Sequence, residues 1–281
     1  MKSVALDELV INSALKSDYW RVSVIDECNS TQDLLLKGKA TVGTVITTEY
    51  QSAGRGRLDR RFDSPKGSGL LFSLTYQPKN QHGELIERDL WGAVNLIAGY
   101  VVAKVLTEYT GEKFLTKWPN DIIIEKKVRP EVEETAKAIT GDKLEDEIKE
   151  EVKKVCGMLA QVFDDHIYLG IGINVTTTQN ELPVQTATSL YIETNKIIDR
   201  NEVLPSILNQ LEEALADFSR GEDFRPYYRA VSSTLGKNVQ ALLPSGEIIY
   251  GRAIDINPNG SLLLENGLVI EVGDIVHLSN S

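Results

Sequence analysis

The chain has 281 residues, of which 42% are hydrophobic and 25% charged, so it has the composition of a globular protein with a sizeable core and room for two domains. Its formal net charge of −11 argues against a general nucleic-acid binder, which would need a basic face, and any anion site must therefore be local. The N-terminus lacks a signal-peptide core and no apolar run reaches spanning length, so we expect a soluble cytoplasmic protein without a membrane anchor.

Cysteine and histidine suggest no metal or thiol chemistry. The two cysteines, Cys28 and Cys156, suit a reducing compartment, and Cys156 lies in an apolar run where packing explains it better than nucleophilic catalysis. The three histidines are scattered without metal-ligand spacing, so we assign no zinc site.

The first predicted elements end in a polar corner. Residues 4–17 have weak helical spacing and predict a short helix, and the alternating β-branched run 21–25 predicts a strand. The strand leads to Ser30, Thr31 and Gln32, where either hydroxyl can cap a helix that starts near Gln32. Hydroxyls at a helix N-terminus often bind a polar ligand group, but simple capping explains the same residues, and both interpretations stay open.

A stretch rich in arginine and glycine, Gln51–Gly69, separates two predicted strands at 43–50 and 70–76. Glycine lets the backbone approach a ligand closely, while the arginine fork matches phosphate and carboxylate oxygens. We therefore interpret the stretch as an anion-binding loop that orders when the anion binds. The alternative is a mobile surface loop whose arginines are solvated.

A predicted core helix at 85–109 precedes a second polar bend. In the β run 114–124, Pro119 and the Asn-Asp pair that follows it interrupt the strand. Lys117 suits a phosphate and Asp121 suits a divalent cation, whereas a structural turn is the alternative interpretation.

The remaining elements complete an α+β fold. Strands are predicted at 155–163 and 166–175, helices at 201–220 and 222–230, and short strands with turns after residue 235. We expect a mixed sheet packed by helices, followed by a small C-terminal all-β barrel. The expected units are a short N-terminal helical segment (1–20), the main domain (21–232) and the barrel (233–281).

Four segments, in this order, resemble the biotin protein ligases, and the resemblance covers residue 21 to the C-terminus with one interruption. They are Ser30-Thr31-Gln32; Gly54-Arg55-Gly56-Arg57 with its continuation; Lys117-Trp118-Pro119-Asn120-Asp121; and Lys154-Val155-Cys156-Gly157 followed by Gly172-Ile173-Asn174.

The resemblance implies a class II synthetase-like catalytic domain that makes biotinyl-5′-adenylate from biotin and ATP, with Mg²⁺. Such enzymes then pass biotin to one lysine of a biotin carrier domain of a carboxylase. The chain resembles the short form of the family, without the N-terminal DNA-binding domain, so neither nucleic-acid nor membrane binding is expected. The alternatives are a lipoate-type ligase and an engineered ligase whose activity the inserted helices modulate. A homodimer and a partner for the insertion also stay open.

The resemblance also assigns roles to residues. Arg57, Lys117 and Lys154 would be catalytic through charge compensation, and Asp121 would lie in the metal shell. Ser30, Thr31, Gln32 and Gln51 would hold the ureido ring, and Asn174 would serve the nucleotide. The remaining expected binding residues are Gly54, Arg55, Gly56, Arg60, Trp118, Asn120 and Gly157. Asp59 and Phe62 depart from the glycine and tryptophan that are common in the family, which puts loop closure and adenylate retention in question.

An insertion at about 128–154 interrupts the resemblance. It is predicted to form two short helices, Glu131–Thr140 and Lys143–Lys154, and the second carries an apolar stripe of Leu144, Ile148 and Val152. The flanking sequences are near-duplicates, but only Lys154 has the family's spacing to Gly157, so we expect Lys127 to have no catalytic role.

Overall fold

A seven-stranded mixed sheet forms the centre of the molecule in the computed structural model, which describes residues 3–57, 60–128 and 149–278. The strand order is β1-β2-β3-β7-β6-β5-β4, with β1 parallel to β2 and the other neighbours antiparallel. The expected mixed sheet is confirmed. Its strands are β1 (Arg21–Cys28), β2 (Thr44–Gln51), β3 (Gly69–Tyr76), β4 (Phe114–Lys117), β5 (Asp121–Val128), β6 (Lys149–Phe163) and β7 (His166–Asn174).

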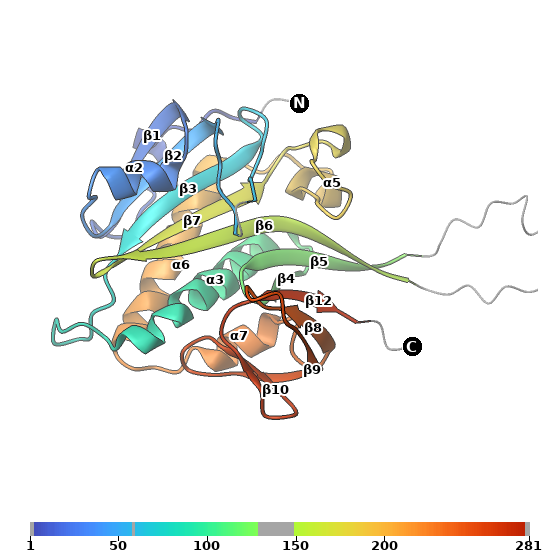
Figure 1. Cartoon of the computed structure of the whole chain (residues 1–281). Helices are drawn as coiled ribbons and strands as arrows, with labels where there is room; N and C mark the ends of the chain where they lie inside the picture. Colours follow the sequence, from blue (N-terminus) through green and yellow to red (C-terminus); the bar gives the residue numbers. More distant parts are fainter. Residues whose placement is uncertain (1–2, 58–59, 129–148, 279–281) are drawn as a thin grey trace, which may run out of the picture.

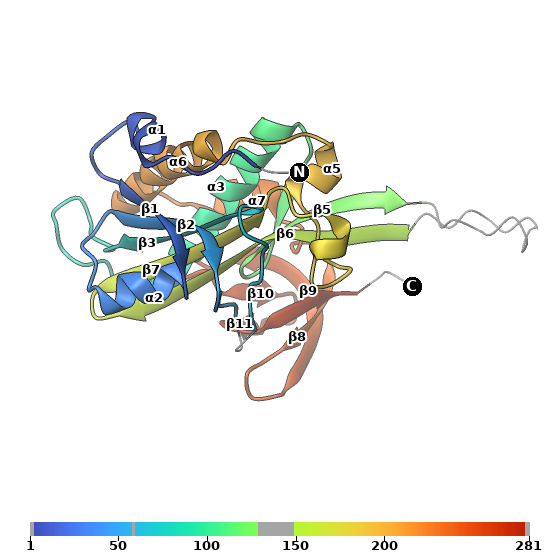
Figure 2. The ribbon, with the colours of Figure 1, turned by 90° about the horizontal axis from the view of Figure 1, so that it is seen from above.

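The long helices α3 (Ala93–Thr110) and α6 (Arg200–Ser219) cover one face of this sheet, and the loop between β2 and β3 lies on the other face together with α2 (Thr31–Lys37) (Figures 1 and 2). A 3₁₀ turn, η1 (Arg88–Gly92), precedes α3. Both long helices pack into the main core with the apolar side chains of β3, β6 and β7. The other short helical elements are α1 (Glu8–Ser13), η2 (Gln179–Glu181), α5 (Leu190–Thr194) and α7 (Arg225–Val231).

The helical segment Arg88–Thr110 is long and apolar enough to cross a membrane by length and composition alone. Two-thirds of its apolar window (67%) is buried inside the protein. Because its side chains pack in the core on several sides, the segment is explained as a core helix.

The C-terminal residues form a five-stranded antiparallel sheet in the order β11-β10-β9-β8-β12. The expected small all-β C-terminal module is confirmed, and among the described residues its sheet has β11 and β12 at its edges without closing into a barrel. It docks on the β4–β5 bend, where Trp118 donates its indole N–H to Gly260 O at 2.9 Å and its backbone N–H to Thr234 Oγ1 at 3.0 Å. The strands are β8 (Asn238–Leu242), β9 (Ile248–Ile256), β10 (Leu262–Leu264), β11 (Val269–Ile270) and β12 (Asp274–His277).

A long hairpin of β5 and β6 projects from the body of the protein (Figure 2). Its ladder continues to the pair Val128 and Lys149, so residues 149–154 are strand and the helix predicted over Lys143–Lys154 is wrong in that part. Antiparallel pairing with β5 decides the conformation of these residues, because a short helix with weak apolar spacing is only marginally stable without packing. The first predicted helix, the stripe residues Leu144 and Ile148, and Asp59 lie outside the described residues.

Candidate active site

A cavity of about 410 Å³ lies where the β2–β3 loop, the β4–β5 bend and the C-terminal sheet meet over the central sheet. This volume is within the usual range of small-molecule sites. The residues assigned from the sequence that line it are Ser30, Thr31, Gln32, Gln51, Arg55, Gly56, Arg57, Arg60, Lys117, Trp118, Asn120, Asp121, Lys154 and Gly157.

The N-terminus of α2 gives the cavity a rigid polar end. Ser30 is the N-cap residue, with its hydroxyl accepting the Asp33 N–H at 3.4 Å. Thr31 donates its backbone N–H to Gln51 Oε1 at 2.8 Å, which joins the helix to the end of β2. The Gln32 amide donates to the backbone oxygens of two strands, at 2.8 and 3.0 Å. The residues that cap and anchor α2 also line the cavity. Helix capping and binding of a polar ligand group are therefore compatible interpretations of this corner.

The arginine- and glycine-rich segment has its own backbone hydrogen bonds. Phe62 donates its N–H to Gly54 O at 3.0 Å, and Gly56 donates to Arg60 O at 2.7 Å. A Cβ at Gly54 would lie 2.2 Å from Phe62 O, so only glycine allows this close approach of the two limbs. Gly54 does not line the cavity; it shapes the loop that does.

Phe62 packs on the sheet inside the cavity. A Cβ at Gly172 would lie 2.7 Å from Phe62 Cε1, and one at Gly157 would lie 3.7 Å from Phe62 Cδ2. The two glycines therefore leave room for the aromatic ring on neighbouring strands. Phe62 was noted in the sequence only as a departure from tryptophan, and the structure places it against the cavity floor.

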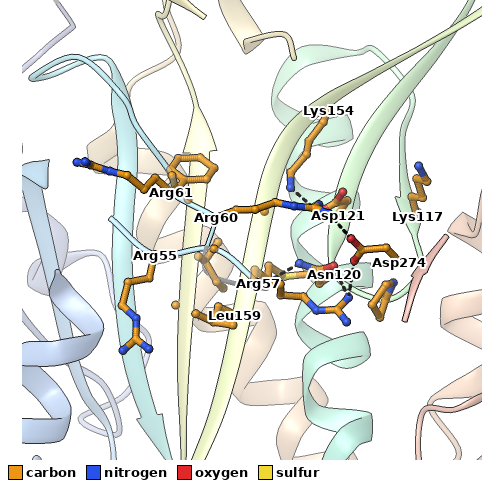
Figure 3. A pocket seen from close by; sticks show the side chains of 18 of the residues that line it. Arg55, Arg57, Arg60, Arg61, Lys117, Asn120, Asp121, Lys154, Leu159 and Asp274 are labelled. Atoms are coloured by element: carbon orange, nitrogen blue, oxygen red, sulfur yellow. Dashed lines mark hydrogen bonds and ion pairs between the residues drawn. The ribbon is translucent and has the colours of Figure 1, made fainter. Parts of the chain in front are cut away.

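Two loop arginines reach the C-terminal sheet (Figure 3). Arg57 donates to Asn120 Oδ1 and to Gly273 O, both at 3.2 Å, and lies 3.7 Å from Asp274 Oδ1. Arg60 pairs with the other oxygen of Asp274. Burial is the main influence on Arg57 and lowers the pKa of its guanidinium, with Asp274 opposing it, but an arginine stays charged at neutral pH.

Arg55 and Arg61 lie to the side of this group. Arg55 forms an ion pair with Asp33 at 2.9 Å, and Arg61 donates to Ser52 O at 2.7 Å. Both arginines line the cavity, and because the ion pair of Arg55 with Asp33 is partly exposed to solvent, it adds little stability.

Lys117, Asp121 and Lys154 form the charged end of the cavity. Asp121 Oδ1 is an ion-pair partner of Lys154 Nζ at 2.6 Å. Burial lowers the pKa of Lys117, an effect that Asp121 opposes and Lys154 reinforces. Two cations and one carboxylate leave a net positive charge, which suits the phosphates of a nucleotide.

A β-bulge directs Lys154 into the cavity. Ile122 pairs with Cys156 and Ile123 pairs with Lys154, so Val155 is the extra residue. Val155 and Cys156 are both fully buried, while Lys154 and Gly157 on either side line the cavity. Cys156 is confirmed as a packing residue, and burial raises the pKa of its thiol.

Two residues discussed from the sequence lie outside the cavity lining. Asn174 is buried outside the cavity lining and donates its amide to Thr188 O at 2.9 Å, so it holds the following segment in place. Lys127 is exposed opposite Glu150, away from the cavity. Sequence reasoning missed Asp274 and Gln240, which line the cavity from the C-terminal sheet, because nothing in the linear order brings that module to the loop.

Comparisons with known proteins agree with this geometry. The sequence profile of the Biotin/lipoate A/B protein ligase family matches residues 24–174, and that of the Biotin protein ligase C terminal domain matches residues 234–278. The chain belongs to the biotin protein ligase family. This ligase is 30% identical over 272 residues to the Biotin--[acetyl-CoA-carboxylase] ligase of Mycobacterium tuberculosis, covering 92% of this chain and 90% of that one.

Two further relatives differ in length. The ligase is 30% identical to the Bifunctional ligase/repressor BirA of Bacillus subtilis, covering 92% of its own length and 74% of that protein. Its fold is similar to that of the biotin protein ligase from Aquifex aeolicus in complex with biotin and ATP, with a TM-score of 0.69, 29% identity, and coverage of 92% of this chain and 98% of the other.

Proposed function

We propose that this protein activates biotin with ATP to biotinyl-5′-adenylate and transfers the biotinyl group to a lysine of a biotin carrier domain of a carboxylase. The observation that carries the proposal is that Arg57, Lys117 and Lys154 line the same cavity as the polar corner at the N-terminus of α2. The proposal is supported by the relatives of this chain, which include a Biotin--[acetyl-CoA-carboxylase] ligase and a biotin protein ligase in complex with biotin and ATP.

In the first step, the biotin carboxylate attacks the α-phosphorus of ATP. A bond forms between a carboxylate oxygen of biotin and the α-phosphorus. The bond between the α-phosphorus and the oxygen that bridges to the β-phosphate breaks, and pyrophosphate leaves. Two anions repel each other, so the contribution of the protein is charge compensation and alignment by Arg57, Lys117 and Lys154. No side-chain nucleophile is needed, which agrees with the inert, buried Cys156.

The polar corner is proposed to bind the ureido ring of biotin. Thr31 and Gln51 are joined by a hydrogen bond, and Ser30 caps α2 through Asp33 N–H, so α2 and β2 hold these polar groups in place. Pre-formed donors and acceptors reduce the ordering cost of binding. Phe62, which packs over Gly157 and Gly172, would contact the apolar part of the substrate.

Mg²⁺ is proposed to enter with the nucleotide. Asp121 is the carboxylate in the cavity beside Lys117 and Lys154, and magnesium is commonly bound through one or two carboxylates together with substrate phosphates. The ion would supply charge neutralisation on the phosphate oxygens. Among the described residues no cluster of three His, Cys, Asp or Glu side chains could hold a metal ion.

In the second step, the neutral amine of an acceptor lysine attacks the acyl carbon of the adenylate, and AMP leaves. Arg57 and its contacts with Asn120 and Gly273 are proposed to keep the mixed anhydride covered until the acceptor arrives. The described cysteines are both free, which fits the reducing cytoplasm proposed as the setting of the reaction.

The proposal is tested by incubating a purified biotin carrier domain with the protein, biotin, ATP and Mg²⁺, and measuring the mass of the carrier. One biotinyl group on the carrier lysine is expected, and a carrier domain with that lysine changed to arginine is the control. The same assay with lipoate competing against biotin distinguishes a biotin ligase from a lipoate-type ligase. If lipoate is attached as well as biotin, the substrate assignment is wrong.

A further inference from the structure

The two ends of the arginine loop meet outside the cavity at one buried charge. Strands β2 and β3 pair as far as Thr48 with Leu71, and the chain between them forms the loop. Glu49 follows the last residue of β2 that pairs with β3, and Gly69 begins β3. These two residues therefore form the neck of the loop, and their separation sets where the loop starts and ends.

Arg200 joins the two sides of this neck. It is the first residue of α6 and is only 1% exposed. Its Nη1 atom lies 2.7 Å from Glu49 Oε2 and donates to Gly69 O at 2.9 Å. Its Nη2 atom donates to Glu49 Oε1 at 3.1 Å. One planar guanidinium thus connects the outgoing limb, the returning limb and the core helix.

The remaining donors of Arg200 bind the N-terminal segment. Nη2 also donates to Val4 O at 2.8 Å, and Nε donates to Ser3 Oγ at 3.0 Å. The Leu6 N–H donates to Glu49 Oε1 at 2.6 Å. A buried charge is costly unless it is paired and hydrogen-bonded, and here the pair is surrounded by such bonds.

The returning limb of the loop is also tied to Glu49. Gly67 donates its N–H to Glu49 O at 2.9 Å and adopts φ +78°, a conformation that favours glycine. Ser68 O accepts two backbone N–H groups from the segment after β7, at 2.8 and 3.0 Å. The neck is consequently rigid, although the middle of the loop is rich in glycine.

We propose that Arg200 is a positioning residue: by fixing the neck of the arginine loop, it holds Arg57 over the bound biotinyl-adenylate. Arg200 does not line the cavity, so it acts through the loop. Arg57 makes its contacts with Asn120 and Gly273 at 3.2 Å, at the edge of good hydrogen-bond geometry, so a small shift of the neck removes them. The inference rests on the proposed function.

The test compares two variants of residues that are adjacent in α6. Arg200→Lys keeps the buried positive charge but lacks the planar fork that reaches Glu49 and Gly69 together. Asn201→Ala is the matched control. Asn201 binds the same N-terminal segment, accepting from Asp7 N at 2.8 Å and donating to Ala5 O at 2.9 Å, and it makes no contact with the loop neck.

Three quantities are measured for the parent and both variants: the midpoint of thermal unfolding, the half-life of radiolabelled adenylate on the protein, and the rate of tryptic cleavage within the loop with biotin and ATP present. For Arg200→Lys we expect adenylate to be lost about ten to a hundred times faster, because a displacement of roughly 1 Å in a positioned group can have an effect of this size. We also expect faster tryptic cleavage at the loop arginines. For Asn201→Ala we expect a lower unfolding midpoint but an unchanged adenylate half-life.

The inference is overturned if the two variants lose adenylate equally, or if Arg200→Lys retains it as long as the parent. If Arg200→Lys does not fold, the paired change Glu49→Gln with Arg200→Gln removes both buried charges, and the same faster loss is expected. A parent protein that makes no adenylate contradicts the proposed function itself, which is a different result from unchanged retention in the variant.

Discussion

Lys154 and Lys127 lie in nearly the same local sequence but in different surroundings in the fold. Each is preceded by a lysine and followed by a valine. Lys154 lies at the β-bulge, forms an ion pair with Asp121 and lines the cavity, whereas Lys127 is exposed opposite Glu150. The family spacing to Gly157 predicted Lys154, which is the one of these two lysines that lines the cavity.

Lys154→Ala should therefore lower kcat/KM for adenylate formation by the equivalent of about 2–4 kcal/mol, because a positioned cation that stabilises transition-state charge is lost. Lys127→Ala is the matched control and should change it little. Initial rates of pyrophosphate release measure both. Equal losses in the two variants would show that the register assigned to the hairpin is mistaken.

Arg57 and Asp274 allow a second test at single residues, because they join the loop to the C-terminal sheet. Arg57→Gly and Asp274→Ala should each shorten the half-life of the adenylate and increase the labelling of bystander lysines. The double variant should lose less than the sum of the two, since both changes break the same contact. Strict additivity would mean that the two residues act separately.

Whether the position of a residue could be predicted depends on how far apart in the sequence its contacts lie. The roles of Ser30, Gln51 and Lys154 as cavity residues could be predicted, because each lies in a short motif whose local geometry is set nearby. Asp274 and the packing of Phe62 on Gly172 could not be predicted, because they depend on contacts between segments far apart in the chain. Asn174 was predicted to serve the nucleotide, and the structure places it at the end of β7, where its side chain donates to Thr188 O in the next segment.

At the scale of elements, the β5–β6 hairpin is the clearest difference from expectation. Apolar spacing predicted a helix up to Lys154, but Val128 and Lys149 lie directly opposite each other in an antiparallel ladder. Cross-strand partners are not visible in a linear pattern, and they decided the structure of residues 149–154. The strands elsewhere were predicted well because their alternation and turn residues are local.

This ladder predicts the effect of a deletion. Replacing residues 129–148 with Asn-Gly should close the hairpin with a two-residue turn, since paired strands of this kind are commonly joined so. The variant keeps Lys154 and its bulge, so it should fold and release pyrophosphate at a rate within about threefold of the parent, because loop length has a small entropic effect. A variant that is folded yet inactive would show that the deleted residues contribute to catalysis.

At the scale of the whole molecule, the C-terminal sheet completes the site by docking on the β4–β5 bend. We retain the proposed division into residues 1–20, 21–232 and 233–281. His277 lies at this junction, where its Nε2 is 3.1 Å from Thr234 Oγ1. Burial, with Lys117 and Lys237 nearby, lowers the pKa of His277 to about 4, while Glu125 opposes the shift.

The low pKa of His277 predicts a dependence of stability on pH. The unfolded chain takes up this proton near pH 6.5 and the folded protein only near pH 4, so the free energy of unfolding should fall as the pH decreases between these values. The effect of this group is at most about 3 kcal/mol. Denaturant unfolding of the parent and of His277→Gln between pH 7 and pH 4 measures it. A variant with the same pH slope as the parent would exclude His277 as the cause.

The central claim is that one cavity brings biotin and ATP together for adenylate formation. The most direct measurement is pyrophosphate release from ATP and Mg²⁺, with and without biotin, in the absence of an acceptor protein. The account predicts a biotin-dependent burst of about one pyrophosphate per protein molecule, followed by slow release, because the covered adenylate blocks further turnover. Release that does not depend on biotin, or no release at all from folded protein, would contradict the account.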